Sequence, residues 1–183
     1  MTQDFDEQPV AWLRDGRLVE KEWRTDGSAP VLLLDPAAGH AQQMLLPQGS
    51  PPFSVSPDDR WLLYSITTSG TSQVSVKSLA TDGMATRVSV KAGADAWWAP
   101  DGREICFRHG ENLVGVSFRP AGGRVDIGSE RVLFPLPESA ALYGVSPDGR
   151  RFLVGRHAEP DPVPGLRVAL HWCDELAIAG TGK

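Results

Sequence analysis

A short turn motif occurs four times along this chain and constrains its fold more than any other feature. The copies read RDGR at 14–17, PDDR at 57–60, PDGR at 100–103 and PDGR at 147–150, and their closing arginines lie 43, 43 and 47 residues apart. Proline presets φ at the second position of a type I turn, and glycine takes the left-handed position that returns the chain. We therefore expect Gly102 and Gly149 at positive φ, and a smaller role for Gly16, whose repeat lacks the proline.

Each repeat contains strand-like segments in the same order, separated by clusters of Gly, Asp, Ser or Pro. The first segment leads into the turn: Pro9–Leu13, Pro52–Ser56, Ala94–Ala99 and Ala141–Ser146. The second leaves it: Leu18–Trp23, Trp61–Thr67, Glu104–Arg108 and Arg151–His157. The third follows a polar loop: Val31–Asp35, Gln73–Leu79, Leu113–Arg119 and Leu166–Cys173. A fourth is visible three times: Gln42–Leu46, Thr86–Val90 and Arg131–Leu136.

These segments predict an all-β fold of antiparallel, propeller-like blades, because repeats of forty-odd residues filled with strands are typical of propellers. Strands that are apolar throughout, such as Trp61–Tyr64, suit sheets covered on both faces. A two-sheet sandwich is the alternative, but it gives no reason for the repeated turn. We predict one repeat domain over residues 1–183, with repeats at about 9–47, 52–90, 94–137 and 141–173 and a tail at 174–183.

Three stretches resemble the blades of TolB-like, or WD-repeat-like, propellers: FSVSPDDRWLLY at 53–64, WWAPDGREICF at 97–107 and YGVSPDGRRFLV at 143–154. The first repeat departs from the pattern, with Leu13-Arg14 in place of Ser-Pro. A further stretch, RVALHWCDEL at 167–176, resembles the end of the propeller region in multidomain bacterial serine/threonine kinases, with His171 where asparagine is common. The resemblances imply a non-catalytic scaffold or sensor that binds a protein or peptide.

The number of repeats does not decide whether the chain closes into a ring, because the propellers that it resembles usually have more than four blades. The chain is either a small closed propeller, an arc that pairs with another copy, or part of a larger propeller. Thr2–Glu7 is a candidate to close the fourth sheet, but it has poor strand propensity. We favour the arc or the fragment, and expect self-association through the open edge of Val168–Cys173, because unpaired strand edges recruit other chains.

Composition restricts the partners and the compartment. A net charge of −5 argues against nucleic acid, and no apolar run is long enough to cross a membrane. The first residues lack the features of a signal peptide, so we expect a cytoplasmic protein, or a periplasmic or extracellular one if the chain belongs to a longer exported protein. Cys106 and Cys173 lie in apolar segments and are expected to be buried thiols, with a single disulfide as the alternative.

No pattern in the sequence predicts an enzyme. The repeated aspartates are explained by turn geometry, Ser56 and Ser146 lack the setting of a nucleophile, and the four histidines form no metal-binding pair. We therefore predict no catalytic residue, no metal and no cofactor. The alternative is an accessory domain of a hydrolase or kinase with a ligand site in the central funnel, where Asp95 is the clearest acidic residue of the inner strands.

The candidate binding residues fall into three groups. Trp97 and Trp98 are adjacent in a strand and must point to opposite faces, so one of them is a candidate contact for a peptide or protein. The arginines that close the four turns, Arg17, Arg60, Arg103 and Arg150, are expected to line one face as a ring. Arg60, Arg103 and Arg150 are the candidates to accept an acidic segment there. His171 and Trp172 are candidate contacts in the last strand. The predicted partner is a protein or peptide, or an upstream part of the same polypeptide.

Overall fold

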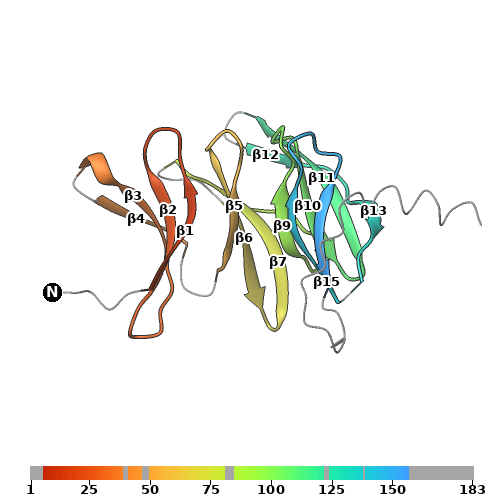
Figure 1. Ribbon diagram of the computed structural model, residues 1–183, viewed down its shortest axis with the longest axis horizontal. Helices are drawn as coiled ribbons and strands as arrows, with labels where there is room; N and C mark the ends of the chain where they lie inside the picture. Colours follow the sequence, from red (N-terminus) through yellow and green to blue (C-terminus); the bar gives the residue numbers. More distant parts are fainter. Residues whose placement is uncertain are drawn as a thin grey trace, which may run out of the picture.

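The chain folds into four antiparallel sheets, of which the first three follow one another along the long axis of the molecule while the fourth overlaps the third in this view (Figure 1). The computed structural model describes residues 6–38, 41–46, 50–80, 85–121, 124–137 and 139–156. Apart from a short 3-10 helix η1 (Pro36–Ala38), the regular elements within these ranges are strands. The prediction of an all-β, propeller-like fold is therefore confirmed.

Each sheet takes its strands from one repeat. Sheet 1 contains β1 (Asp6–Trp12), β2 (Leu18–Trp23), β3 (Val31–Asp35) and β4 (Ala41–Leu46). Sheet 2 contains β5 (Pro52–Val55), β6 (Trp61–Thr68), β7 (Thr71–Ser78) and β8 (Ala85–Arg87). Sheet 3 contains β9 (Ala94–Trp98), β10 (Glu104–His109), β11 (Asn112–Ala121), β12 (Arg124–Ile127) and β13 (Arg131–Pro135). The described part of sheet 4 contains β14 (Ala140–Val145) and β15 (Phe152–Arg156).

Most strands lie where the sequence places them, and β2 and β3 coincide with their predicted bounds. The sequence pattern missed β12, whose short RVDI segment lacks an apolar run and pairs with the end of the long β11. The predicted strand Leu166–Cys173 lies outside the described residues. Asp6 and Glu7 extend β1 and pair with β2, so this part of the proposed closing segment belongs to sheet 1 rather than to sheet 4.

The hydrophobic core consists of three clusters, one between each pair of neighbouring sheets. On β6, Leu62 and Tyr64 pack toward sheet 1, whereas Leu63 between them packs toward sheet 3. On β10, Ile105 and Phe107 likewise pack toward sheet 2. Alternate side chains of a strand point to opposite faces, so one central strand supplies two different cores. The fully apolar run at the start of β6 has this physical origin.

The repeated turn joins the first two strands of every sheet. Its third motif residue has positive φ in all four copies: 90° at Gly16, 59° at Asp59, 69° at Gly102 and 70° at Gly149. In each copy this residue donates its N–H to the carbonyl three positions earlier. The expectation for Gly102 and Gly149 is confirmed. The expectation of a smaller role for Gly16 is not supported by its geometry, because its turn keeps the same conformation without the proline.

The first turn is one residue shorter than the others, although the spacing of the motifs hides this. Leu13 N donates to Arg17 O, whereas Ser56 N donates to Trp61 O, Ala99 N to Glu104 O and Ser146 N to Arg151 O. Arg17 therefore occupies the place of Trp61 and not that of Arg60. The set of equivalent turn arginines is restricted to Arg60, Arg103 and Arg150.

Two residues that depart from the Pro-Asp-Gly-Arg motif, Arg14 and Asp59, contact each other between sheets 1 and 2. In sheets 2 and 3 the turn proline lies beside the glycine of the next turn: a Cβ on Gly102 would be 3.5 Å from Pro57 Cδ, and one on Gly149 would be 3.7 Å from Pro100 Cδ. In sheet 1 the proline is replaced by Arg14, and in sheet 2 the glycine is replaced by Asp59. Arg14 N donates to Asp59 Oδ2 over 2.8 Å, and the guanidinium Nε lies 3.8 Å from the same oxygen.

We expect Gly102→Val and Gly16→Val to lose similar free energies of unfolding, on the order of 1–3 kcal/mol each, because a β-branched residue is penalised at positive φ. Chemical denaturation measures both losses. Gly144→Val is the matched control, since this strand glycine is not at positive φ and has open space around its Cβ position. A loss at Gly102 with none at Gly16 would contradict the equivalence of the turns.

We expect a double-mutant cycle of Arg14→Gln and Asp59→Asn to give a coupling of about 0.2–1 kcal/mol, the range of exposed ion pairs. Asparagine keeps the shape of Asp59 and tolerates positive φ, so the cycle isolates the charge. The coupling measured by denaturation should shrink in 1 M salt, because screening weakens exposed charges. Additive losses at low salt would show that the two charges do not interact.

Candidate functional site

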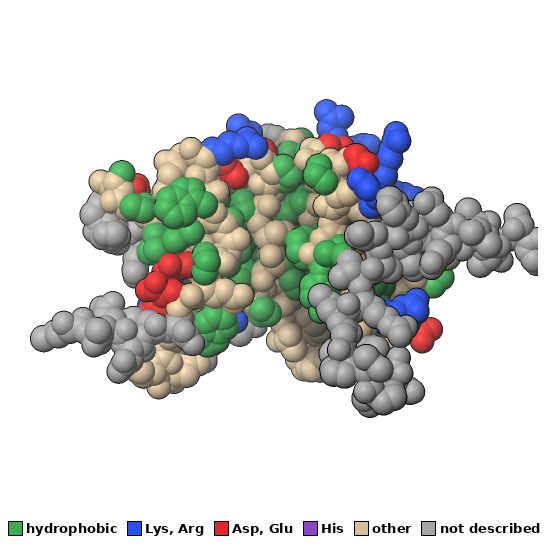
Figure 2. All heavy atoms as spheres, in the orientation of Figure 1, with side chains coloured by type: hydrophobic (Ala, Val, Ile, Leu, Met, Phe, Trp, Pro, Cys, Tyr) green, Lys and Arg blue, Asp and Glu red, His purple; other side chains and the backbone are tan. Residues whose placement is uncertain are grey.

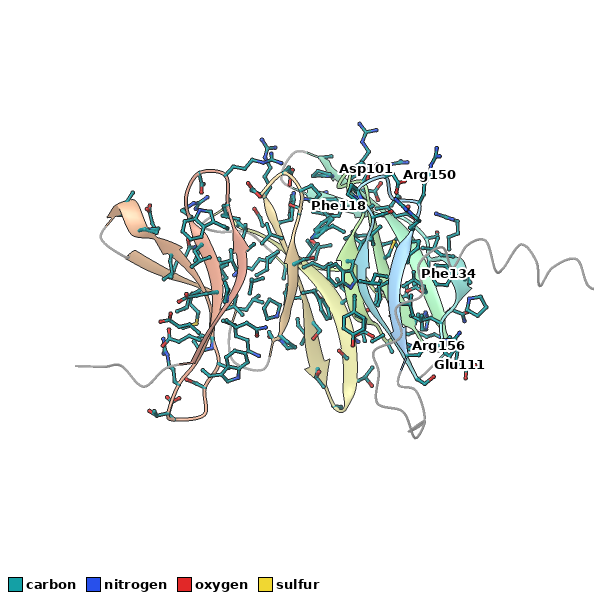
Figure 3. All side chains as sticks on the ribbon, in the orientation of Figure 1. Asp101, Glu111, Phe118, Phe134, Arg150 and Arg156 are labelled. Carbon is teal, nitrogen blue, oxygen red and sulfur yellow. The ribbon has the colours of Figure 1, made fainter. Side chains whose placement is uncertain are left out.

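A cleft of about 780 Å³ lies at the end of the sheets opposite the repeated turns. Consecutive hairpins of a meander alternate between its two ends, so the β6–β7 and β10–β11 hairpins lie away from the turns. Figure 3 shows this arrangement, with Asp101 and Arg150 at one end and Glu111 at the other. The walls come from these two hairpins and from the connections that enter β9 and β14. Three consecutive sheets thus contribute to one cavity.

Asp95 and Arg108 form the charged pair of the cleft. Arg108 Nε lies 3.2 Å from Asp95 Oδ2, and the arginine side chain is 14% exposed while the aspartate side chain is 40% exposed. Arg108 also donates to the carbonyls of Leu136 and Pro137, each over 3.1 Å, and to that of Ala140. The guanidinium therefore fixes the connection to sheet 4 and leaves the carboxylate at the cavity surface.

Asp95 has a positive φ of 47°, a backbone conformation that is uncommon for residues other than glycine. Non-glycine residues in this region are uncommon and concentrate at functional sites, where the surrounding structure holds them. The contact with Arg108 explains how this conformation is held. The sequence singled out Asp95 as the acidic residue of the inner strands, and the structure places it on the wall of the cleft.

The remaining lining of the cleft is small, polar or acidic. Most of its positions are Gly, Ala, Ser or Thr, which leave backbone groups accessible to a ligand. Glu111 lies at the tip of the β10–β11 hairpin and is exposed. Because Arg108 already faces Asp95, the Glu111 carboxylate gives the cleft an excess of negative charge. Sequence reasoning missed both Arg108 and Glu111, since neither belongs to the repeated motif.

The turn arginines lie on the opposite end of the molecule. Arg60, Arg103 and Arg150 are exposed, and within the described part of the chain their guanidinium groups form no ion pair. Figure 2 shows basic side chains along this edge with acidic ones between them. A turn aspartate precedes each arginine by two positions and accepts its backbone N–H, as Asp101 does from Arg103 over 2.9 Å. The neighbouring carboxylates limit the positive potential of this face.

Trp97 and Trp98 point to opposite faces, as the sequence requires, and both pack between sheets. Trp98 is 7% exposed and meets Phe118 edge-to-face with ring centroids 4.8 Å apart. Trp97 is half-buried against sheet 4 and donates from Nε1 to Leu142 O over 3.3 Å. Their role in partner contact stays a prediction, now limited to the partly exposed Trp97. His171 and Trp172 lie outside the described residues.

The serines and aspartates of the turns are occupied by the turns themselves. Ser56 Oγ donates to Asp58 Oδ1 over 2.5 Å and accepts the N–H of Trp61 over 3.0 Å, and Ser146 has the same partners in its own turn. The hydroxyl of Ser146 and the N–H of Arg150 lower the pKa of Asp148. In the ranges that the structure describes, no group of three His, Cys, Asp or Glu side chains is arranged to hold a metal ion.

Cys106 is a buried free thiol in the core between sheets 3 and 4, as predicted, with 3% exposure. Burial raises its pKa to about 12 and the nearby Glu104 carboxylate adds to the effect. Only the thiolate is nucleophilic, so this cysteine is unreactive at neutral pH. Cys173 lies outside the described residues.

Two solved TolB structures support the fold. TolB from Acinetobacter baumannii aligns with a TM-score of 0.54 and 20% identity over 81% of this chain and 37% of that protein. A protein assigned as TolB from Agrobacterium tumefaciens aligns with a TM-score of 0.54 and 17% identity over 87% of this chain and 61% of that protein. A Bacteroides fragilis protein assigned as a 6-phosphogluconolactonase reaches a TM-score of only 0.46, with 18% identity over 81% and 47% of the two chains.

The chain has the fold of a TolB-type propeller. It spans 37% and 61% of the lengths of these two TolB structures, less than two thirds of either. No protein-family model and no curated protein sequence matches it. None of the described elements is a helix with the length and apolar character needed to cross a membrane. At this level of identity the likeness establishes the fold alone.

We expect Cys106 in a Cys173→Ser variant to react with Ellman's reagent at pH 8 at least 100-fold more slowly than a free thiol, because burial and the raised pKa suppress the thiolate. The rate should rise with pH and become fast in denaturant. Thr67→Cys, at an exposed position of β6, is the matched control and should react rapidly. Fast labelling of native Cys106 would show that the sheet 3–sheet 4 core is open.

Proposed function

We propose that this protein is a non-catalytic binding module that holds a short protein or peptide segment in the cleft at the hairpin end of its sheets. The observation that carries the proposal is the lining of this cleft, in which small residues expose backbone groups and Asp95 and Glu111 supply negative charge. Backbone hydrogen bonds suit an extended segment, and the carboxylates favour one that carries lysine or arginine. The hydrogen bonds of Arg108 to Asp95 and to the segment that enters sheet 4 support the proposal, because a cleft wall that is already ordered reduces the conformational entropy lost on binding.

The partner's identity depends on what surrounds this chain. A propeller that docks a segment of its own polypeptide and one that docks a separate protein would use the same cleft. The likeness of RVALHWCDEL at 167–176 to propellers fused to bacterial kinases favours a partner upstream in the same polypeptide, and this stretch lies outside the described residues. The same context would make the chain an accessory domain of an enzyme rather than the enzyme.

We expect peptides selected from a random array by the full chain to be enriched in lysine and arginine. Glu111→Lys should weaken their binding at least tenfold, measured by fluorescence anisotropy, because it reverses the free charge of the cleft. Arg103→Glu, on the turn face, is the matched control and should leave binding within about twofold. Selection of acidic peptides that are lost by Arg103→Glu would move the site to the turn arginines. An array that yields no binder would contradict peptide recognition itself.

A further inference from the structure

The outer face of sheet 1 has exposed apolar residues on its edge strands, Trp12 and Met44, and buried carboxylates between them, and no other sheet of the described chain packs on it. In the strand register Trp12 lies opposite Leu18, Leu18 opposite Leu34, and Leu32 opposite Met44. Directly paired residues share a face, and this face is opposite the one on which Val19 and Leu33 contact sheet 2. Trp12 is 72% exposed and Met44 is 60% exposed. Figure 2 shows hydrophobic side chains on the visible surface over sheet 1.

This face has the composition of a surface on which another blade packs. Trp12 is the last residue of β1 and pairs with Leu18, and Trp98 is the last residue of β9 and pairs with Ile105. The two tryptophans are therefore equivalent, yet Trp98 is 7% exposed because sheet 2 covers it. Leu18 corresponds in the same way to Ile105 and to Leu62, which are both fully buried between sheets.

Acidic residues distinguish the outer face from the internal ones. Glu20 occupies the place of Tyr64 and Phe107, and Glu22 lies two residues further on the same face. Each is 5% exposed, and Glu22 accepts from Arg24 Nε over 2.9 Å. Burial and the carboxylates of Glu7 and Glu22 raise the pKa of Glu20. Both carboxylates are already buried within the single chain and Glu22 is paired with Arg24, so a partner that brings a basic group to this face is favoured over a wholly apolar one.

The opposite end of the molecule offers such a surface. Leu153 of β15 occupies the place of Val19, Leu63 and Cys106, which are at most 3% exposed, yet Leu153 is 52% exposed. Tyr143 is 60% exposed beside Gly155 on the same face. The exposed Arg151 lies just before β15, two residues from Leu153, and its guanidinium is 4.0 Å from Asp148. Sheet 1 and sheet 4 are the first and last sheets of the stack, because the three core clusters each join consecutive sheets.

We propose that the outer face of sheet 1 binds the outer face of sheet 4 in a second copy of this chain. The contact continues the stacking that already joins the four sheets, with the acidic residues of sheet 1 in one copy facing the sheet 4 surface beside Arg151 in the other. Both open faces are used when two copies join head to tail in each direction. Four sheets from each copy then make eight blades, which is within the usual range of closed propellers. Such a ring is symmetric and does not propagate into a filament.

Sedimentation velocity of the full 183-residue chain tests the proposal, with an expected mass of twice 19.8 kDa at micromolar concentration. Trp12→Asp and Leu153→Asp should each raise the dimer dissociation constant at least 100-fold. Val132→Asp, at a 60% exposed position of β13, is the matched control and should remain dimeric. Each single variant keeps one intact face, so a mixture of the two should form a 1:1 heterodimer that neither forms alone.

The alternative occupants of the face give different results, and each would overturn the proposal. A wild-type chain that stays monomeric at 100 µM would leave the face to a segment outside this sequence. A Leu153→Asp variant that still dimerises would show that sheet 1 pairs with itself. A Trp12→Asp variant that lowers the melting temperature of a monomer would indicate closure within one chain. Trp12→Ser and Leu153→Ser, checked for folding by circular dichroism, repeat the comparison if either aspartate variant does not fold.

Discussion

The requirement that both faces of every sheet be covered shapes this molecule more than any single contact. A propeller sheet has a neighbour on each side, so successive residues of one strand belong to different cores. Leu62 and Leu63 are both fully buried, yet they contribute to separate clusters. Trp97 and Trp98 divide in the same way between sheets 4 and 2. In a sheet with one face in solvent, such an apolar run would expose hydrophobic side chains. Here both faces are covered, so the same run contributes to two cores.

Different interactions stabilise the two ends of the sheets. At the turn end, proline and glycine of successive turns lie side by side, and the first pair of turns substitutes an ion pair for that contact. At the hairpin end, Arg108 connects β10 to Asp95 and to three carbonyls of the segment that enters sheet 4. The segments that line the cleft are consequently held by side chains rather than by the sheets alone, which suits a site that must keep its shape without a ligand.

Local patterns were sufficient to predict most of the described strands, the turns and the opposite orientation of Trp97 and Trp98, because each depends on a few neighbouring residues, but they missed the short β12. The site was not predictable in the same way. Arg108 lies 28 positions from Leu136 and 32 from Ala140, and no repeat of residue types marks that relationship. The first two motif spacings are both 43 residues, so they did not reveal that the first turn is one residue shorter than the others. Only the observed hydrogen bonds show that Arg17 stands apart from the other turn arginines.

Glu20 shows how an end face differs from an internal one. Each internal face packs on a neighbouring sheet of the same chain, so complementary shape and apolar area are sufficient there. At the position equivalent to Glu20, these internal faces carry the aromatic residues Tyr64 and Phe107. An end face meets its neighbour by diffusion and must exclude other apolar surfaces. A carboxylate at the centre of the face disfavours every partner that does not supply a complementary charge, because an unpaired buried charge is costly. In the contact proposed for this face, Glu20 in place of an aromatic ring would disfavour wholly apolar partners and favour a blade with basic residues at its surface.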